Sequence, residues 1–474
     1  MRMEKFKAIN NTQIFLLPPS VEEFVKDNHL ARLVSEVVDR LDTSSIEKRY
    51  SCLGQKSYHP RLLLKLWIYG YATGILSGRK IAIMCETDTA YMYLASMYRP
   101  DFRTINDFRK DNSEFFEDCF KQVLQICREL GMGKVGLIAI DSTKIRANAS
   151  VKKSVTKQTY EQWLAEVENQ IKTLQQQADE LNTNEDADLK EERGDELPKQ
   201  LREKNQLREK IQGALNKIKS GDKRINLTDT DSQLIKCSGQ KKPAYNCQGA
   251  VSEDGIIVAA YATNKANDKE QLQEVINQVE TNVSEKIGVV LADSGYSSYE
   301  NYQWLSEQGK AAYIPDQEEQ ASKERLADPY DRGHFVYDPV RNEYTCPTGK
   351  TLTYTRTVNS HTRKQYFNQF DGTACNECAV KGDCTTGAKR QIHQELREPL
   401  RDAMRQRLNS KEGKEIYKKR MNTVEHAWGN MKFNCRVVMF HLRGLKKVNS
   451  EFQLLAIGHN IKKISRKKTE KKKE

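Results

Sequence analysis

The stretch Val135–Ser150, VGLIAIDSTKIRANAS, decides how this chain folds. Its first six residues form an apolar run that contains β-branched residues and follows glycines at positions 131 and 133, which predicts a buried strand. Asp141 is the first charged residue after this run. A carboxylate therefore stands where a central strand leaves the core, and a rigid strand end is the support that a metal-binding active site needs.

A second stretch has the same form, because the apolar residues of IGVVLADSG, Ile287–Gly295, lead to Asp293. Two strand-like segments lie between the two acids, at 245–253 and 256–264, and an Asp-Gly pair joins them. Such a pair between apolar segments is a strong hairpin signal. The two acids are therefore predicted to end two strands of one sheet.

The remaining segments of the core complete that sheet. Residues 269–280 and about 298–309 are helix-like, and 311–315 is strand-like. Strands joined by a tight hairpin are antiparallel, whereas strands joined across a helix are parallel. We therefore predict an α/β fold with a mixed five-stranded sheet and flanking helices.

Regions of other character surround and interrupt this core. Apolar residues at helical spacing run from about 20 to 130. Two polar helices around an acidic link indicate an antiparallel, coiled-coil-like hairpin, and a later segment carries four clustered cysteines. The predicted organisation is a helical N-terminal domain, an α/β core in two segments, a helical-hairpin insertion, a Cys-containing insertion and a basic tail: residues 1–130, 131–317 with 401–464, 157–220, 318–400 and 465–474.

The chain is basic, since its 474 residues are 30% charged and carry a net charge of +12. Excess positive charge favours a phosphate-rich partner through counterion release, although a solvated basic surface would give the same value. No apolar run reaches the roughly 18 residues of a membrane span, and no G-x4-G-K-[ST] loop for ATP occurs. Six basic residues of the helical domain fit DNA contacts or ordinary surface equally well: Arg79, Lys80, Arg99, Arg103, Arg109 and Lys110.

A third acid comes from a helix-like segment, Tyr417–Phe433, which places Glu425 between Arg420 and Lys432. Phosphodiester cleavage needs an activated oxygen nucleophile and stabilised phosphoryl charge, which two Mg²⁺ about 4 Å apart supply when carboxylates hold them. The candidate trio is Asp141, Asp293 and Glu425. Competing carboxylates are left outside it: Asp229, Asp231, Asp254, Asp268 and Glu300.

The chain resembles the DDE-class transposases of bacterial insertion sequences nearly from end to end. The motifs that carry the resemblance include SYHPRLLLKLWIYGYATGILSGRKIA, RPDFRTINDFRK, IDSTKIRANAS, NLTDTDSQLIK, YNCQGAV, VLADSGYSS, and VEHAWGNMKF followed by LRGLKKV and LLAIGHNIKKI. The set is specific, whereas no single motif is. The resemblance implies an RNase H-like catalytic core in which Asp141, Asp293 and Glu425 are the catalytic acids and the ligands of two Mg²⁺, for which Mn²⁺ substitutes. It also implies that the helical N-terminal domain, residues 1–130, serves DNA binding or dimerisation.

Related transposases carry a Tyr-x2-Arg-x3-Glu-x6-Lys pattern around the last acid. Tyr417, Arg420, Glu425 and Lys432 match it, and the resemblance implies that Tyr417, Arg420 and Lys432 contact DNA. This chain has four residues between Arg420 and Glu425, one more than the pattern. The extra residue weakens the match to the pattern for Arg420 more than for Glu425.

The four clustered cysteines allow two interpretations of equal weight. Cys346, Cys375, Cys378 and Cys384 have the thiol number and one of the spacings of a structural Zn²⁺ site. Free thiols are the alternative, because the other spacings are irregular.

The resemblance implies a nucleoid-associated protein of the bacterial cytoplasm that acts on double-stranded DNA as a homodimer or larger complex, without ATP and without a membrane. It would cut at the terminal inverted repeats of its element and join the 3′ ends to target DNA. Two alternatives stay open, namely a catalytically inactive DNA-binding descendant of a transposase and a hydrolytic RNase H-like nuclease.

Overall fold

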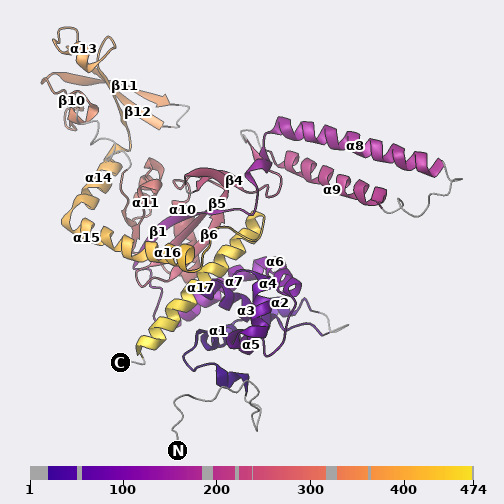
Figure 1. Cartoon of the computed structure of the whole chain (residues 1–474). Helices are drawn as coiled ribbons and strands as arrows, with labels where there is room; N and C mark the ends of the chain where they lie inside the picture. The colour runs from indigo at the N-terminus through magenta and orange to yellow at the C-terminus, as the bar shows by residue number, and fades with distance from the viewer. Residues whose placement is uncertain are drawn as a thin grey trace, which may run out of the picture. The chain divides into compact units, whose positions relative to one another are not determined.

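The computed structural model describes residues 20–50, 56–183, 196–218, 224–237, 239–316, 328–360 and 365–471 (Figure 1). Residues 184–195 of the predicted hairpin and 472–474 of the predicted tail lie outside these ranges. The chain divides into two compact units, one formed by 1–127 with 430–474 and the other by 128–429. No helix in the described ranges is long and apolar enough to cross a membrane.

The first unit is helical, as the apolar spacing predicts. Its elements are η1 (Val21–Phe24), α1 (Leu30–Arg40), α2 (Ser44–Glu47), α3 (Pro60–Thr73), α4 (Gly78–Thr87), α5 (Thr89–Leu94), α6 (Phe102–Asp111), α7 (Ser113–Glu129), η6 (Asn430–Asn434) and α17 (Leu445–Lys471). The buried helix α3 contacts both α1 and α17. A side chain at Gly458 of α17 would lie 2.8 Å from the backbone nitrogen of Ala72, so glycine permits this close helix packing.

One sequence expectation for this unit changes in the structure. Arg109, weighed above as a DNA contact, is 4% exposed, stacks on Trp67 and donates a 2.8 Å hydrogen bond to the Tyr71 hydroxyl. It therefore stabilises the helical core and does not face a ligand. The predicted basic tail is helical as far as Lys471, because α17 continues through it.

The second unit contains the predicted mixed sheet. Its strands are β1 (Leu137–Arg146), β4 (Gln233–Cys237), β5 (Gln240–Ser252), β6 (Ile257–Thr263), β7 (Val289–Leu291) and β8 (Ala311–Tyr313). The order β6-β5-β1-β7-β8 is antiparallel across β6, β5 and β1 and parallel across β1, β7 and β8. This confirms the RNase H-like fold class.

The strand β4 was not predicted. β5 begins at Gln240, five residues before the predicted start, and its early part pairs with β4 while its later part pairs with β6. The sequence QKKPA extends β5 past the residues that pair with β6, and β4 pairs with this extension. The sheet therefore has six strands. The predicted hairpin turn is present, with Gly255 at φ +82°.

Helices flank this sheet. α10 (Leu272–Val283) contacts β5 and β6, and α11 (Tyr299–Glu307) connects β7 to β8 and contacts α14 (Glu398–Asn409). The chain continues from α14 through α15 (Lys411–Arg420), η5 (Met421–Glu425) and α16 (His426–Gly429). The last three elements carry the predicted third acid and its neighbours.

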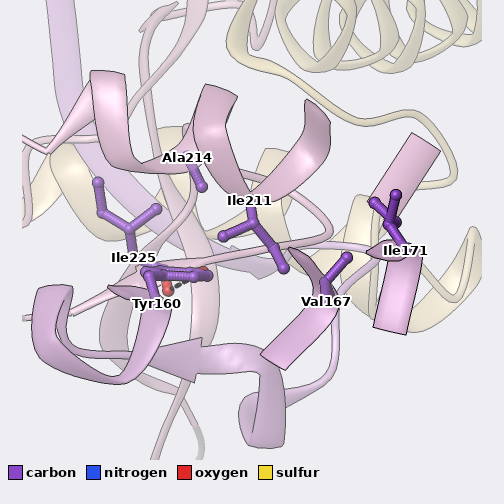
Figure 2. Close-up of a cluster of buried hydrophobic side chains, with 6 residues drawn as sticks. All are labelled: Tyr160, Val167, Ile171, Ile211, Ala214 and Ile225. Carbon is purple, nitrogen blue, oxygen red and sulfur yellow. Dashed lines mark hydrogen bonds between the residues drawn. The ribbon is translucent and has the colours of Figure 1, made fainter. Parts of the chain in front are cut away.

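The predicted helical hairpin consists of α8 (Lys157–Thr183) and α9 (Glu196–Lys217), which contact each other along their length (Figure 1). Its buried cluster lies close to the sheet-side end of the helices and is drawn in Figure 2: Tyr160, Val167, Ile171, Ile211, Ala214 and Ile225. The Tyr160 hydroxyl donates a 2.9 Å hydrogen bond to the Ile225 carbonyl. The short ladder of β2 (Ser154–Val155) with β3 (Ile225–Asn226) closes the base of the hairpin.

The Cys-containing insertion folds around a sheet of its own. Its strands are β9 (Val336–Asp338), β10 (Glu343–Thr345), β11 (Thr351–Ser360), β12 (Gln365–Gly372) and β13 (Gln391–Glu395), all antiparallel in the order β13-β12-β11-β10-β9. The short elements η4 (Arg332–His334) and α13 (Lys381–Cys384) complete it. A small aromatic core that includes Tyr344 and Phe370 holds this sheet together.

Candidate active site

Asp141 and Asp293 lie at the same step of two adjacent parallel strands. Ala139 of β1 pairs with Leu291 of β7, and each acid stands two residues beyond its member of this pair. Asp141 is still within β1, whereas Asp293 follows β7 and caps the 3₁₀ turn η3 (Ser294–Tyr296), accepting a 2.9 Å hydrogen bond from the Gly295 amide. The structure thus places these two predicted acids next to each other on neighbouring strands, but Asp141 lies in the middle of β1 and not at the predicted strand end, because the pairing with β5 continues to Arg146.

The environment of the two acids disfavours their charged forms. Burial raises the pKa of Asp141 to about 6, the charges of Asp293 and Asp268 add to the rise, and Arg420 opposes it. Burial also raises the pKa of Asp293, again with Asp268 adding to the rise and Arg420 opposing it. Two carboxylates that are costly to ionise form a site that a bound cation would stabilise.

Arg420 is the cation next to this pair in the structure. Its Nη2 atom lies 3.3 Å from the Asp141 Oδ1 atom, and the two side chains are only 11% and 18% exposed. One turn earlier, the Tyr417 hydroxyl donates a 3.2 Å hydrogen bond to the carbonyl of Ala292, the residue before Asp293. Two of the three predicted DNA-contacting residues therefore lie beside the two acids.

The extra residue between Arg420 and Glu425 coincides with a change of helix type. α15 ends at Arg420, and residues 421–425 form the π-helical segment η5. A π turn holds one more residue than an α turn, so an inserted residue is absorbed without rotating the flanking helix faces. The π-helical segment therefore accommodates the extra residue between Arg420 and Glu425, and Tyr417 and Arg420 lie before it in α15.

Glu425 is exposed at the end of η5, in contrast to the two aspartates. Lys432 belongs to η6 in the first unit. Within the described ranges, no group of three or more His, Cys, Asp or Glu side chains is placed to share a metal ion. The structure thus brings together Asp141, Asp293, Arg420 and Tyr417 and leaves Glu425 apart from them.

A tight packing contact sets the helix above the acids. Gly249 of β5 pairs with Asp141, and a side chain added at Gly249 would lie 2.6 Å from the Trp428 ring. Trp428 is buried in α16, directly after Glu425 and η5. The absence of a side chain at Gly249 therefore allows the helix that carries Arg420 and Glu425 to approach the strand that carries Asp141.

The sequence analysis set Asp268 aside and did not consider Lys144. Asp268 is close enough to both acids to raise their pKa, and its carboxylate forms an ion pair of 3.1 Å with Lys144 of β1. The DSTK motif gave one sequence signal for Lys144, because this lysine lies only three residues after Asp141 in the same segment. No sequence signal pointed to its partner Asp268, which lies more than 120 residues away.

The four clustered cysteines all line one cavity of about 30 Å³ in the Cys-containing insertion. The amides of Lys350 and Arg390 donate to the sulfurs of Cys346 and Cys375 over 3.2 and 3.4 Å. Burial raises the pKa of Cys346, but hydrogen bonds from Thr348 and Lys350 outweigh it and leave that pKa lowered. The thiols are neighbours, yet the described residues do not place them as a metal ligand set, so Zn²⁺ gains no support.

Two family models match the chain. One is described as a transposase DDE domain and matches residues 345–465, and the other is described as a transposase domain and matches residues 19–111. The first match includes Glu425, Arg420 and the four clustered cysteines, and the second covers most of the N-terminal helices. No curated protein matches the chain significantly.

Proposed function

Because the chain is a DDE-class transposase of an insertion sequence, we propose that it cuts DNA at the terminal inverted repeats of its element and joins the freed 3′ ends to target DNA. One observation carries the chemical part of this proposal. Asp141 and Asp293 stand at the same step of adjacent parallel strands, both partly buried and both with a raised pKa.

The family implies a DNA substrate and the use of divalent metal ions. The donors at the acid pair fit Mg²⁺, because carboxylate oxygens are its preferred protein ligands and Arg420 only partly offsets the cost of ionising the two acids. Asp141 and Asp293 would hold two ions together with Glu425. Since Glu425 is exposed in the structure, this assignment requires the η5–α16 segment to turn it inward when metal or DNA binds. Bound Mg²⁺ supplies an activated oxygen nucleophile and stabilises phosphoryl charge.

The neighbouring cations have roles that follow from their positions. Arg420 neutralises Asp141 in the structure, and a bound cation would take over that task and release the guanidinium. A guanidinium beside the reacting phosphate matches phosphate geometry with two parallel hydrogen bonds. Tyr417 anchors α15 to the strand end that carries Asp293. Lys432 and the other basic residues of a chain with net charge +12 would bind the DNA backbone, in a dimer or larger complex.

The proposal is tested with purified protein, a duplex that carries the ends of the element, and Mg²⁺ or Mn²⁺. We expect metal-dependent cuts at the ends, followed by joining of the 3′ ends to a target duplex. Cuts without joined products would favour the hydrolytic nuclease. Salt-sensitive DNA retention without any metal-dependent product would favour the inactive DNA-binding protein.

A bound structural Zn²⁺ in the Cys-containing insertion stays a prediction of its own, with the zinc content of purified protein as its measurement. If Cys346, Cys375, Cys378 and Cys384 bind Zn²⁺, about one equivalent should copurify, and Cys378→Ser should lose the metal and melt earlier. Cys435→Ser, at a buried cysteine outside the insertion, is the control for removing a thiol. Protein without stoichiometric zinc, whose Cys378→Ser variant melts like the wild type, would exclude the site.

A further inference from the structure

A buried polar network lies behind the two acids, with the Asp268 carboxylate at its centre. Asp268 Oδ1 accepts hydrogen bonds from the side-chain amides of Asn246 and Gln248, each over 2.7 Å. Asp268 Oδ2 accepts one from the Ser142 hydroxyl over 3.0 Å. The Lys144 ammonium lies 3.1 Å from both oxygens. We call these five side chains the Asp268 network.

The Asp268 network joins the elements that carry the acids. Ser142 pairs with Gln248 and Lys144 with Asn246 across β1 and β5, so these four side chains share one face of the sheet, while Asp141 and Gly249 occupy the other face. Asp268 comes from the loop between β6 and α10. The network therefore fixes β1 from the face opposite to the one on which Trp428 packs.

The same network also reaches the turn that carries Asp293. The Tyr296 hydroxyl, in η3, donates a hydrogen bond to Gln248 Oε1, and both side chains are fully buried. A side chain added at Gly295 would lie 2.9 Å from Asp293 Oδ1 and 3.6 Å from Asp268 Oδ2, so both carboxylates adjoin Gly295. One connected set of hydrogen bonds thus holds both the strand of Asp141 and the turn of Asp293.

The hydrogen-bond donors and acceptors of Asp268 and Lys144 are already used within the network. A carboxylate offers about four acceptor positions, and Asp268 receives five contacts from four side chains. The three donors of Lys144 are directed at Ser142, Asn246 and Asp268. Neither charge is available to a metal ion or a phosphate without breaking the network, so a role in catalysis must be indirect.

Resting on the proposed function, we propose that Asp268 and Lys144 are positioning residues for the metal site, which hold the strand of Asp141 and the turn of Asp293 in place relative to each other. Outer partners that orient metal ligands typically change metal affinity by about 10–100-fold when they are replaced. Asp268 acts on β1 through Ser142 and Lys144. It acts on η3 through Gln248 of β5, which accepts the hydrogen bond of Tyr296. Lys144 places a positive charge 3.1 Å from the Asp268 carboxylate.

The two charges give the test its direction. Removing a cation near two carboxylates should by charge alone strengthen Mn²⁺ binding, whereas loss of the network should weaken it. We therefore expect Lys144→Gln and Asp268→Asn each to weaken Mn²⁺ binding by about 10-fold or more, measured by electron paramagnetic resonance on the full-length protein without DNA. Tyr296→Phe, which removes only the link to η3, should give a smaller change in the same direction. DNA affinity should stay at the wild-type value in all three variants.

Matched controls come from an exposed pair on the helical hairpin, Lys157 and Glu161, whose charged atoms are 3.7 Å apart. Lys157→Gln and Glu161→Gln should leave Mn²⁺ affinity and thermal midpoint unchanged, since exposed pairs at this spacing contribute little. If Asp268→Asn fails to fold, Lys144→Gln and Tyr296→Phe carry the test.

Tighter or unchanged Mn²⁺ binding by Lys144→Gln would overturn the positioning role. That result differs from a failure of the proposed function. If wild-type protein bound Mn²⁺ at the acid pair, as shown by loss of binding in Asp141→Asn, but cut no DNA, the proposed function alone would fail. If it bound and cut normally while the network variants matched the wild type, the positioning role alone would fail.

Discussion

Replacing Asp141 with Asn is expected to lower DNA cleavage by at least about 1,000-fold, because a ligand of the metal pair is lost. The same variant should be more stable than the wild type at neutral pH when no metal is present. The reason is that burial raises the pKa of Asp141 from 3.8 to about 6, so that its ionised form destabilises the fold. Loss of activity together with a gain in stability is the result expected when a carboxylate needed for cation binding destabilises the metal-free protein.

The direction with pH follows from this raised pKa. The folded protein binds the Asp141 proton more tightly than the unfolded chain, so raising the pH from about 4 to about 6 costs stability, up to roughly 3 kcal/mol at higher pH. The Asp141→Asn variant has no such proton to lose and therefore does not bear this cost. The difference between variant and wild type should be near zero below about pH 4 and full above about pH 6.

Thermal melting in chelator at several pH values measures this difference, and DNA binding by the variant should survive because basic residues supply it. Added Mg²⁺ should stabilise the wild type at neutral pH and leave the variant unchanged. A variant that melts below the wild type at neutral pH without metal would contradict the assignment of Asp141 to a cation site in which the ionised carboxylate destabilises the fold.

Replacing Gly249 with Ala is expected to lower cleavage by about 100-fold, since displacing catalytic groups by about 1 Å can cost this much. The added carbon would meet the Trp428 ring at 2.6 Å and the Ala259 carbonyl at 3.0 Å. Overpacking of this kind typically costs about 1–3 kcal/mol and shifts the backbone. The shift would move α16 and η5 away from the strand that carries Asp141.

A second substitution, at Trp428, tests whether this contact is the cause of the loss. Gly249→Ala combined with Trp428→Leu should recover part of the activity, because the smaller side chain gives room for the added carbon. Gly213→Ala is the matched control, since nothing lies within 4 Å of a side chain added there. Wild-type cleavage by Gly249→Ala would show that the contact between Gly249 and Trp428 does not position the helix.

The features that could be predicted from sequence are those encoded within short stretches. Each of the two aspartates ends an apolar run, and the alternation of strands and helices between them determined the topology of the sheet. The strand β4 was not predicted because QLIKC is only five residues long and QKKPA, the segment with which it pairs, is mostly polar. The separate sheet of the Cys-containing insertion was not predicted because its core joins residues as distant as Tyr344 and Ile392.

The surroundings of the acids depend on contacts across long sequence distances. The Asp268 network requires the pairing of Ser142 with Gln248 and the return of the chain at Asp268. Nothing local to these residues specifies that geometry. The π-helical segment η5 had a sequence counterpart in the extra residue before Glu425, but a spacing difference alone does not say whether the helix rotates or bulges.

Three-acid catalysis can be tested by excision in cells of a marker bounded by the flanking DNA of the element, with expressed wild-type or Glu425→Gln protein. The wild type should excise the marker, and the variant should excise it at least about 1,000-fold less, although Glu425 is exposed in the structure. Glu412→Gln, at an exposed glutamate of α15, is the control and should excise normally. Equal excision by wild type and Glu425→Gln would contradict the three-acid metal site.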